Sequence, residues 1–172
     1  SLKINEDISP VVDPPRKIPF KLYDNLKLEL TRMIDLNVIV KESEPTEWVN
    51  SIVLVTKPNG SLRLCLDPRN LNKAILRPHY PFPSIEECKA KLSGSKIFTS
   101  LDANSGFWMI PLNKQSSKLC TFNTPFGRYR FLRLPFGINA APEIFHAEMV
   151  KLFGDIPVLI IYIDDFLIYS ST

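Results

Sequence analysis

The sequence predicts an α+β fold in which an antiparallel sheet packs on helices. Apolar residues recur at helical spacing around residues 22–33 and 140–153, and a capping-box spacing marks a third helix at residues 84–92. Between and after these segments lie short runs rich in β-branched and aromatic residues, bounded by turn-forming residues as in hairpins. The chain of 172 residues is 45% hydrophobic and 23% charged, a composition typical of globular chains that bury a core.

The first nineteen residues contain four prolines and show no apolar period. We therefore expect residues 1–19 to form an extended N-terminal arm that lies on the domain, or else a linker within a longer polypeptide. A helix is predicted after the arm, because leucine and methionine recur at helical spacing from Leu22 to Met33. The pattern fades near Asn37, where this helix should end.

Two strand-like runs, Ser51–Thr56 and Leu62–Leu66, flank an Asn-Gly pair at residues 59–60, which is a strong hairpin signal. The net charge of the chain is +3, and residues 57–77 alone carry +4, so the basic character is local. The basic residues of this window are Lys57, Arg63, Arg69, Lys73 and Arg77. Asp67, its single acid, is expected to form a structural ion pair with Arg69.

A second helix is predicted over Ser84–Leu92, where Ser84 and Glu87 have the spacing of a capping box and Gly94 follows the end. The next element is a strand, Ile97–Leu101, that runs into Asp102. Further strands are expected at three places, which are Phe107–Leu112, Leu119–Asn123 and Tyr129–Leu132.

A third helix is predicted over Ala140–Phe153, opened by Asn139 and closed by Gly154. The last predicted element is a hairpin over Val158–Tyr169. It consists of two apolar strands around the acidic pair Asp164-Asp165.

Other residue types favour no special site. Three cysteines, Cys65, Cys88 and Cys120, are an odd number without CxxC spacing, so neither a disulfide framework nor a zinc site is expected. This cysteine pattern fits a reducing, intracellular setting. A soluble chain is predicted, because the longest apolar stretch, residues 158–163, is too short to span a bilayer. His79 and His146 have no partner at metal-ligand or triad spacing, so ordinary surface or core roles are expected.

The acidic pair is the first feature that points to chemistry. Taken alone, Asp164-Asp165 is best read as a solvated turn. Asp102 changes this, because a strand that ends at Asp102 beside the hairpin would bring three carboxylates to one edge of a sheet. Hard oxygen ligands suit Mg²⁺, and two such ions support phosphoryl transfer. Spacing cannot show the convergence, since 62 residues separate Asp102 from Asp164.

Residues 162–165, Tyr-Ile-Asp-Asp, resemble the YxDD box of reverse transcriptases, and other segments resemble further motifs of that family in the family's order. A fingers motif is matched at residues 62–72, the first palm motif at 100–112, and two intervening motifs at 122–129 and 134–142. Together they cover nearly the whole chain after Asp35. Phe136, where retroviruses usually have Gln, makes the chain more similar to gypsy-type long-terminal-repeat retrotransposons.

The resemblance implies the fingers and palm of a right-hand polymerase fold. Residues 20–95 would form mostly fingers and residues 96–172 the palm, with 113–135 partly returning to the fingers. The chain would end before the primer grip and thumb. Its activity would be RNA-directed DNA polymerisation, a nucleotidyl transfer from a dNTP to a primer 3′-hydroxyl.

The resemblance also implies site residues. The catalytic and metal-binding carboxylates would be Asp102, Asp164 and Asp165, holding Mg²⁺ with Mn²⁺ as a substitute. The nucleotide-binding residues would be Lys57, Arg63, Ala103, Phe107, Phe136 and Gly137. Among these, Lys57 and Arg63 would meet the triphosphate, and Phe107 would exclude a ribose 2′-hydroxyl. Tyr162 would contact the primer or template.

Plainer readings stay open beside these roles. Lys57 and Arg63 also fit a solvated basic hairpin, and Phe107 and Tyr162 also fit core aromatics on strands. The implied partners are an RNA or DNA template with primer, a dNTP, and the rest of a pol polyprotein with thumb, connection and ribonuclease H. The implied location is a cytoplasmic virus-like particle or the nucleus.

Two other functions compete with a reverse transcriptase. One is a retrotransposon remnant kept as a nucleic-acid-binding or interaction module without turnover, against which the intact carboxylates speak. The other is an RNA-dependent RNA polymerase, against which Phe107 speaks, because a ribonucleotide-using enzyme should carry a polar residue there.

Overall fold

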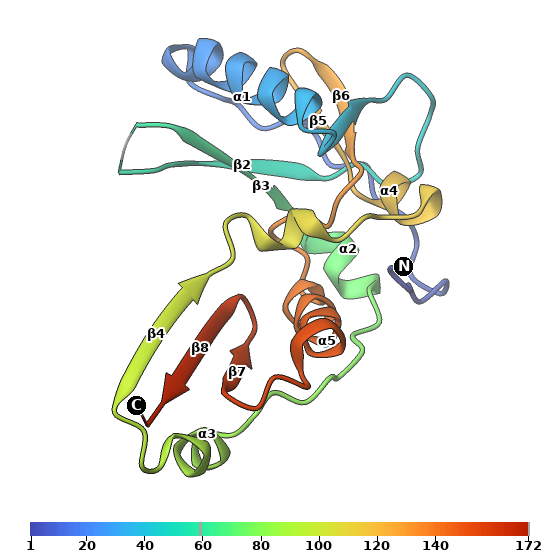
Figure 1. Cartoon of the computed structure of the whole chain (residues 1–172). Coiled ribbons are helices and arrows are strands. Elements are labelled where there is room, and N and C mark those ends of the chain that lie inside the picture. The colour runs from blue at the N-terminus through green and yellow to red at the C-terminus, as the bar shows by residue number, and fades with distance from the viewer. Residues whose placement is uncertain (59, 172) are drawn as a thin grey trace. The chain divides into compact units, whose positions relative to one another are not determined.

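The structure is a computed structural model that describes residues 1–58 and 60–171. It divides into two compact units. Figure 1 shows the whole chain, coloured by residue number from the N-terminus to the C-terminus. Unit 1 comprises Ser1–Leu76 and Phe107–Asn139, and unit 2 comprises Arg77–Gly106 and the chain from Ala140 onward.

Unit 1 contains two antiparallel sheets. Strands β1 (Ile39–Lys41), β6 (Gly127–Phe131) and β5 (Thr121–Thr124) form one in that order, and β2 (Ser51–Thr56) and β3 (Leu62–Asp67) form the other. Its helical elements are η1 (Phe20–Leu22), α1 (Tyr23–Asp35), α2 (Arg69–Ala74), η2 (Gly106–Met109) and α4 (Lys114–Leu119). The first residue of η2, Gly106, belongs to unit 2.

The core of unit 1 confirms the predicted helical period of α1. Leu26, Leu30 and Met33 are at most 2% exposed, whereas Leu28, on another face of the helix, is 69% exposed. Leu64 of β3 and Phe131 of β6 are also fully buried. Burial of such side chains contributes about 1.5–3 kcal/mol each, so this stripe fixes α1 on the unit.

The N-terminal arm is extended, as predicted. Residues 1–19 contain no helix or strand and only isolated bridges, which pair Ile4 with Ile75 and Val12 with Val49. Arg16 from the arm joins the predicted ion pair of Asp67 and Arg69, in which Nε and Oδ1 lie 3.2 Å apart. The arm is thus tied to unit 1 along its length.

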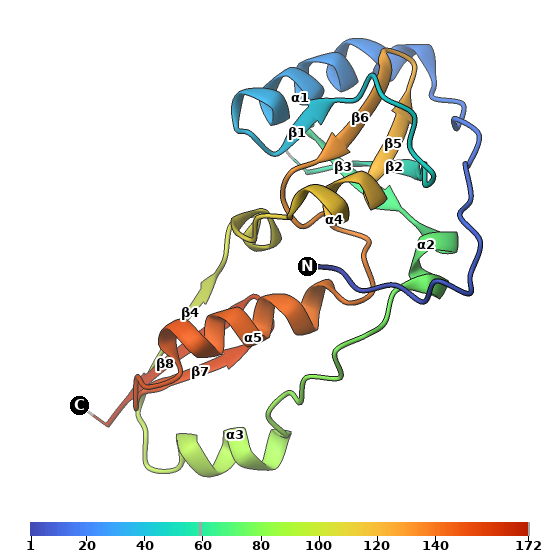
Figure 2. The ribbon, with the colours of Figure 1, turned by 90° about the vertical axis from the view of Figure 1, so that its right-hand side faces the viewer.

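Unit 2 contains one antiparallel sheet with the strand order β4-β8-β7. Its strands are β4 (Ile97–Asp102), β7 (Leu159–Tyr162) and β8 (Asp165–Ser170), and its helices are α3 (Ile85–Leu92) and α5 (Ala141–Phe153). Helix α5 contacts β7 and lies along the sheet in Figure 2. Phe145 and Met149 on α5 and Ile160 and Ile161 on β7 supply buried side chains.

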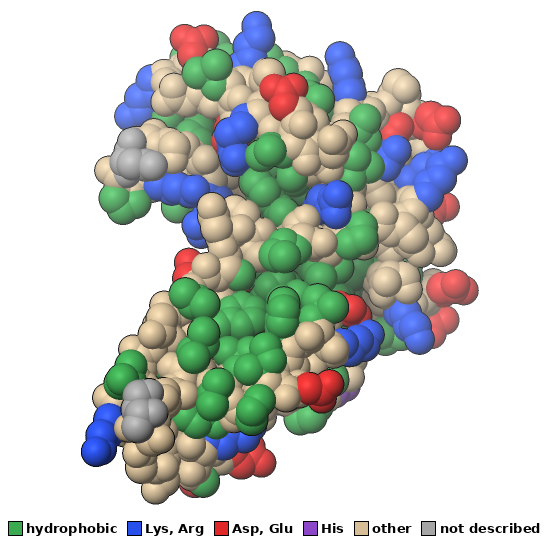
Figure 3. All heavy atoms as spheres, viewed as in Figure 1, with side chains coloured by type: hydrophobic (Ala, Val, Ile, Leu, Met, Phe, Trp, Pro, Cys, Tyr) green, Lys and Arg blue, Asp and Glu red, His purple; other side chains and the backbone are tan. Residues whose placement is uncertain are grey.

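Strand β4 lies at the edge of this sheet, and all six of its residues are exposed. Ile97, Phe98 and Leu101 each leave about half of their surface accessible. Figure 3 shows hydrophobic side chains at the surface over the sheet of unit 2. Such an apolar edge strand is unusual, because soluble proteins normally charge or cover their sheet edges.

Several predicted elements are confirmed. The β2–β3 hairpin pairs antiparallel as expected, although Asn59 of its turn lies outside the described residues. Ser84 and Glu87 form the predicted capping box of α3, in which the Glu87 amide donates to Ser84 Oγ at 3.1 Å. Strand β4 runs into Asp102 as expected.

Other predictions are wrong. Residues 106–109 form the 3-10 helix η2, where a strand over Phe107–Leu112 was expected. Leu119 ends α4 and does not begin a strand; this short helix, capped by Asn113, has no apolar period that could have announced it. The predicted opening of α5 by Asn139 is wrong by one residue, since the N-cap is Ala140 and the Asn139 side chain donates instead to the Asn72 carbonyl.

Two further features complete the fold. Cys65, Cys88 and Cys120 are free thiols. Within residues 1–58 and 60–171, no helix combines the length and apolar character that crossing a bilayer requires.

Candidate active site

Asp102 and Asp165 face each other in the sheet of unit 2. They form the last register pair of the antiparallel β4–β8 ladder, and the Ala103 amide donates to the Asp164 carbonyl at 3.1 Å. Side chains of such a pair point to the same face, with Cβ atoms about 4.5–5.5 Å apart. The expectation that the strand ending at Asp102 lies beside the acidic hairpin is therefore confirmed.

The hairpin turn itself consists of Ile163 and Asp164, because Tyr162 and Asp165 form the pair that closes it. Asp165 is thus the first residue of β8, and only Asp164 lies in the turn, which corrects the expectation of two carboxylates at the tip. Ile163 has a φ of 58°. A positive φ at the first turn position matches the strand twist of two-residue hairpins, but it strains a β-branched residue.

The donor set fits a hard divalent cation. Among the described residues, no group of three or more His, Cys, Asp and Glu side chains already has the arrangement of a metal site. Mg²⁺, however, usually binds through one or two carboxylates, with water and substrate phosphates as its other ligands. The pair of Asp102 and Asp165 next to Asp164 offers such oxygens without a preformed cage.

The backbone after Asp102 is fixed by a close contact. The Gly106 amide donates to the Ala103 carbonyl at 3.0 Å, and a Cβ on Gly106 would lie 2.9 Å from both the Ala103 Cβ and the Phe145 ring. Gly106 therefore lets the turn that follows β4 pack directly on Phe145 of α5. The Ala103 carbonyl, a predicted site group, is accordingly held in a defined turn.

Unit 1 brings three of the predicted nucleotide-binding residues together. The Arg63 guanidinium lies 5.3 Å from the centroid of the Phe136 ring, and the Phe107 and Phe136 ring centroids are 5.0 Å apart. Lys57 lies at the turn of the same hairpin, where its amide donates to the Ser61 carbonyl. The predicted strand setting of Phe107 is wrong, since its ring projects from η2.

The Phe136-Gly137 turn is bound tightly to β3. The Leu66 amide donates to the Phe136 carbonyl at 3.0 Å. Gly137 has a φ of 107°, and a Cβ there would lie 1.9 Å from the Leu66 carbonyl oxygen. Only glycine satisfies both the backbone angle and this approach.

Comparison with known proteins decides the family. The family model described as "Reverse transcriptase (RNA-dependent DNA polymerase)" matches residues 55–172, more than half of the chain. This chain belongs to the reverse transcriptase family. The pol polyprotein of transposon 412 from Drosophila melanogaster is 30% identical to it over 179 residues, covering 99% of this chain and 14% of the polyprotein.

Other similar proteins agree with this assignment. The enzymatic polyprotein of cauliflower mosaic virus (strain CM-1841) is 29% identical, covering 99% of this chain and 26% of the viral protein. A solved foamy viral protease-reverse transcriptase in complex with double-stranded DNA is 25% identical, with a TM-score of 0.84 over 96% of this chain and 29% of that chain. The reverse transcriptase chain thus spans 14–29% of these proteins. Its fold is the fingers and palm fold of the family.

Asn72 is a residue of this reverse transcriptase chain whose role was not predicted. Its Nδ2 donates to the Gly137 carbonyl at 2.9 Å, and its Oδ1 accepts from the Asn139 amide at 3.0 Å. The signal was present, because Asn72 ends the segment that resembles the fingers motif. Asn72 ties that motif to the Phe136-Gly137 turn.

Tyr162 is 46% exposed, so a buried core setting for it is wrong. Its ring packs on Phe82 with centroids 5.9 Å apart. Tyr162 and Asp165 also line a cavity of about 890 Å³ in unit 2, together with apolar residues of α3 and β8. The tyrosine is therefore positioned by its neighbours and still open to a ligand.

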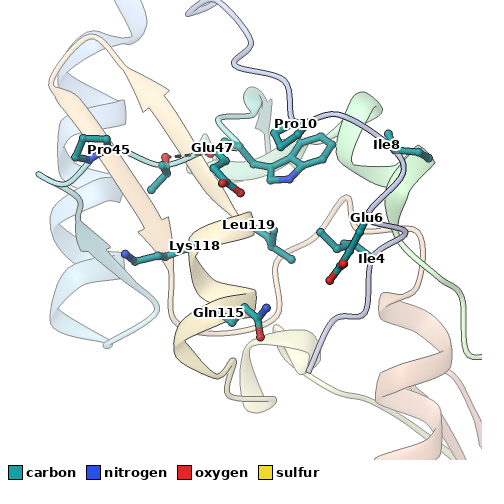
Figure 4. A pocket seen from close by; sticks show the side chains of 11 residues that line it. Ile4, Glu6, Ile8, Pro10, Pro45, Glu47, Gln115, Lys118 and Leu119 are labelled. Carbon is teal, nitrogen blue, oxygen red and sulfur yellow. Dashed lines mark hydrogen bonds between the residues drawn. The ribbon is translucent and has the colours of Figure 1, made fainter.

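A second cavity, of about 580 Å³, lies in unit 1 between the N-terminal arm and α4 (Figure 4). Ile4, Glu6 and Ile8 line it from the arm, and Gln115 and Lys118 line it from α4. None of the predicted site residues of the reverse transcriptase chain lines this cavity.

Proposed function

We propose that this chain supplies the fingers and palm of an RNA-directed DNA polymerase, which adds a deoxynucleotide to a primer 3′-hydroxyl along a template and releases pyrophosphate. The observation that carries the proposal is the register pair of Asp102 and Asp165, next to Asp164, in a chain of the reverse transcriptase family. Catalysis by such a site is positioning and charge stabilisation, with no covalent intermediate on the protein.

Asp102, Asp164 and Asp165 would hold the divalent cations, Mg²⁺ or Mn²⁺. Cations bound at such a site help to activate an attacking hydroxyl and to stabilise a leaving oxygen. The pairing of β4 with β8 supports these roles, because it brings carboxylates remote in sequence to one end of a sheet. The Ala103 carbonyl would add a ligand next to Asp102.

Lys57 and Arg63 would bind the triphosphate of the incoming nucleotide. Positive charge close to the phosphates offsets the charge that develops on the leaving pyrophosphate. Stacking of Arg63 on Phe136 supports this role, since it orients the guanidinium before the ligand arrives. Phe107 and Gly137 would line the same nucleotide pocket, with Phe107 against the sugar.

The partners would be a primed RNA or DNA template, a dNTP and the remainder of a pol polyprotein. The foamy viral relative was solved with double-stranded DNA, and both polyprotein relatives are several times longer than this chain. Residues 20–95 would form mostly fingers, and residues 96–172 would form the palm, with 113–135 partly returning to the fingers. A gypsy-type retrotransposon origin fits Phe136. For a protein of that origin, the place of action would be a cytoplasmic virus-like particle or the nucleus.

Primer extension tests the proposal. The chain, and a longer polyprotein that contains it, are given a primed RNA template, dNTPs and Mg²⁺. We expect extension that Asp164→Asn abolishes and that Asp155→Asn, an exposed residue outside the sheet, leaves unchanged. Extension that survives both Asp102→Asn and Asp164→Asn would overturn the proposal. Salt-sensitive nucleic-acid binding without any extension would favour a non-catalytic binding module.

A further inference from the structure

His146 on α5 contacts the backbone of the catalytic hairpin. Its Nδ1 accepts a hydrogen bond from the Ile163 amide, with the two nitrogens 3.3 Å apart, although 17 residues separate them in sequence. His146 is only 2% exposed, so the predicted core role is correct for its burial. The bond to the turn adds a role that sequence spacing did not indicate.

His146 Nδ1 accepts this bond from Ile163, the residue of the turn whose backbone is strained. Ile163 has a φ of 58°, a region that β-branched side chains rarely occupy and that persists only where the surroundings enforce it. Asp164 follows Ile163 directly and Asp165 begins β8. The backbone conformation at Ile163 therefore determines the positions from which both aspartate side chains project. A hydrogen bond to the Ile163 peptide thus acts on the acidic end of the turn.

Aromatic rings hold the imidazole in place. The ring centroids of Tyr80 and Phe82 lie 5.6 Å and 5.1 Å from that of His146, and Phe82 also packs on Tyr162 at 5.9 Å. The segment at residues 80–82 thus touches both the acceptor and the strand that enters the turn. An imidazole packed in this way has little freedom to move away from Ile163.

We propose that His146 is a positioning residue of the polymerase site: its imidazole, neutral and protonated on Nε2, clamps the Ile163 peptide and thereby holds Asp164 and Asp165 against Asp102. The catalytic part of this inference rests on the proposed function, whereas the clamp itself does not. Burial lowers the pKa of His146, which favours the neutral form that can accept this bond.

Amide hydrogen exchange and imidazole ¹⁵N shifts test the clamp in the 172-residue chain. We expect ¹⁵N shifts of an Nε2-protonated, neutral His146. We also expect the Ile163 amide to exchange at least about tenfold faster in His146→Leu, which removes the acceptor, and near the parent rate in His146→Gln, whose amide oxygen can accept. Met149→Leu, an equally buried change on the same helix, should leave Ile163 unaffected.

The clamp is overturned if Nδ1 carries the proton, or if a folded His146→Leu protects Ile163 as well as the parent does. If His146→Leu fails to fold, the tautomer of the parent and the exchange rate in His146→Gln still decide. These readouts need no catalytic activity, so an inactive parent would overturn the proposed function alone.

Primer extension by the longer polyprotein tests the catalytic part. Loss of positioning should lower kcat about tenfold in His146→Leu with little change in KM for the dNTP, and His146→Gln should restore kcat. An unchanged kcat in an active, folded His146→Leu enzyme would show that the clamp does not position the carboxylates.

Discussion

Asp102 and Asp165 occupy directly opposed positions on neighbouring strands, so two negative charges share one end of the β4–β8 ladder. Like charges in opposed positions destabilise a sheet. The two carboxylates that would bind a cation are therefore expected to destabilise the folded protein when no cation is bound.

Neutralising one member of this pair should stabilise the metal-free protein. We expect Asp165→Asn to raise the free energy of unfolding by up to about 1 kcal/mol in the presence of a chelator. This difference in stability between variant and parent should vanish in millimolar Mn²⁺. The parent, with all three carboxylates, is then stabilised by the bound cation, whereas the variant binds the cation more weakly. Urea unfolding with chelator or Mn²⁺ measures both values. Asp155→Asn serves as control, and equal responses of the two variants to Mn²⁺ would contradict the prediction.

Gly137→Ala should destabilise unit 1 strongly. The added Cβ would meet the Leu66 carbonyl oxygen at 1.9 Å with a backbone φ of 107°, so both a clash and backbone strain arise. A loss of about 3 kcal/mol is expected in urea unfolding. Gly94→Ala is the matched control, since Gly94 has a φ of 80° with no atom within 4 Å of the new Cβ. It should cost about 1 kcal/mol, and equal losses would argue against the clash.

If Arg63 binds the triphosphate as proposed, Arg63→Ala should weaken binding of a dNTP about tenfold or more, because a charged hydrogen-bond donor to phosphate would be lost. Phe136→Leu should weaken it about threefold, since the ring that orients the Arg63 guanidinium is removed while the charge remains. Titration with a fluorescent dNTP analogue measures both. Lys21→Ala removes an exposed charge from the same unit and should change affinity little. A Phe136→Leu affinity equal to that of the parent would exclude the orienting role.

Phe107→Val should relax sugar selection. A smaller side chain at η2 would leave room for a 2′-hydroxyl if Phe107 packs against the nucleotide sugar. The ratio of dGTP to rGTP use in primer extension, by a polyprotein that has the proposed activity, should then fall at least about tenfold. Trp108→Phe, a change at the next position of η2, is the comparison. Equal use of both nucleotides by the parent would instead point to a core role for Phe107.

Arg77→Met should destabilise unit 2. Arg77 Nε donates to Glu143 Oε1 at 3.0 Å, and Glu143 is only 3% exposed. Removing the guanidinium would leave the buried Glu143 carboxylate without its counter-charge. We expect this to lower the free energy of unfolding by about 3 kcal/mol. Lys151→Met, which breaks an exposed ion pair with Glu148 on the same helix, should change stability by less than about 0.5 kcal/mol. The double variant Arg77→Met/Glu143→Gln should recover part of the loss.

Local elements were largely predictable from the sequence. The period of Leu26, Leu30 and Met33 indicated α1, and Ser84 with Glu87 indicated the start of α3, because these signals act over a few residues. Phe107 was misplaced, since a short apolar run cannot distinguish a strand from one turn of 3-10 helix. The short polar helix α4 was missed because it depends on the Asn113 cap and carries no apolar stripe.

The site was predictable only in composition. The three aspartates could be singled out, but the register that sets Asp102 against Asp165 depends on pairing between distant segments. The bond from Ile163 to His146 depends likewise on how α5 packs beside the hairpin. Neither spacing nor residue type carries that information, so contacts of this kind need coordinates.

The edge strand β4 has a consequence for how the chain behaves in solution. With no further strand beside it among the described residues, β4 offers a row of backbone donors and acceptors flanked by Ile97, Phe98 and Leu101. Another copy can add to such a row and continue the ladder from molecule to molecule. At high concentration the isolated chain should therefore self-associate through β4, and a charged substitution such as Phe98→Lys should keep it monomeric.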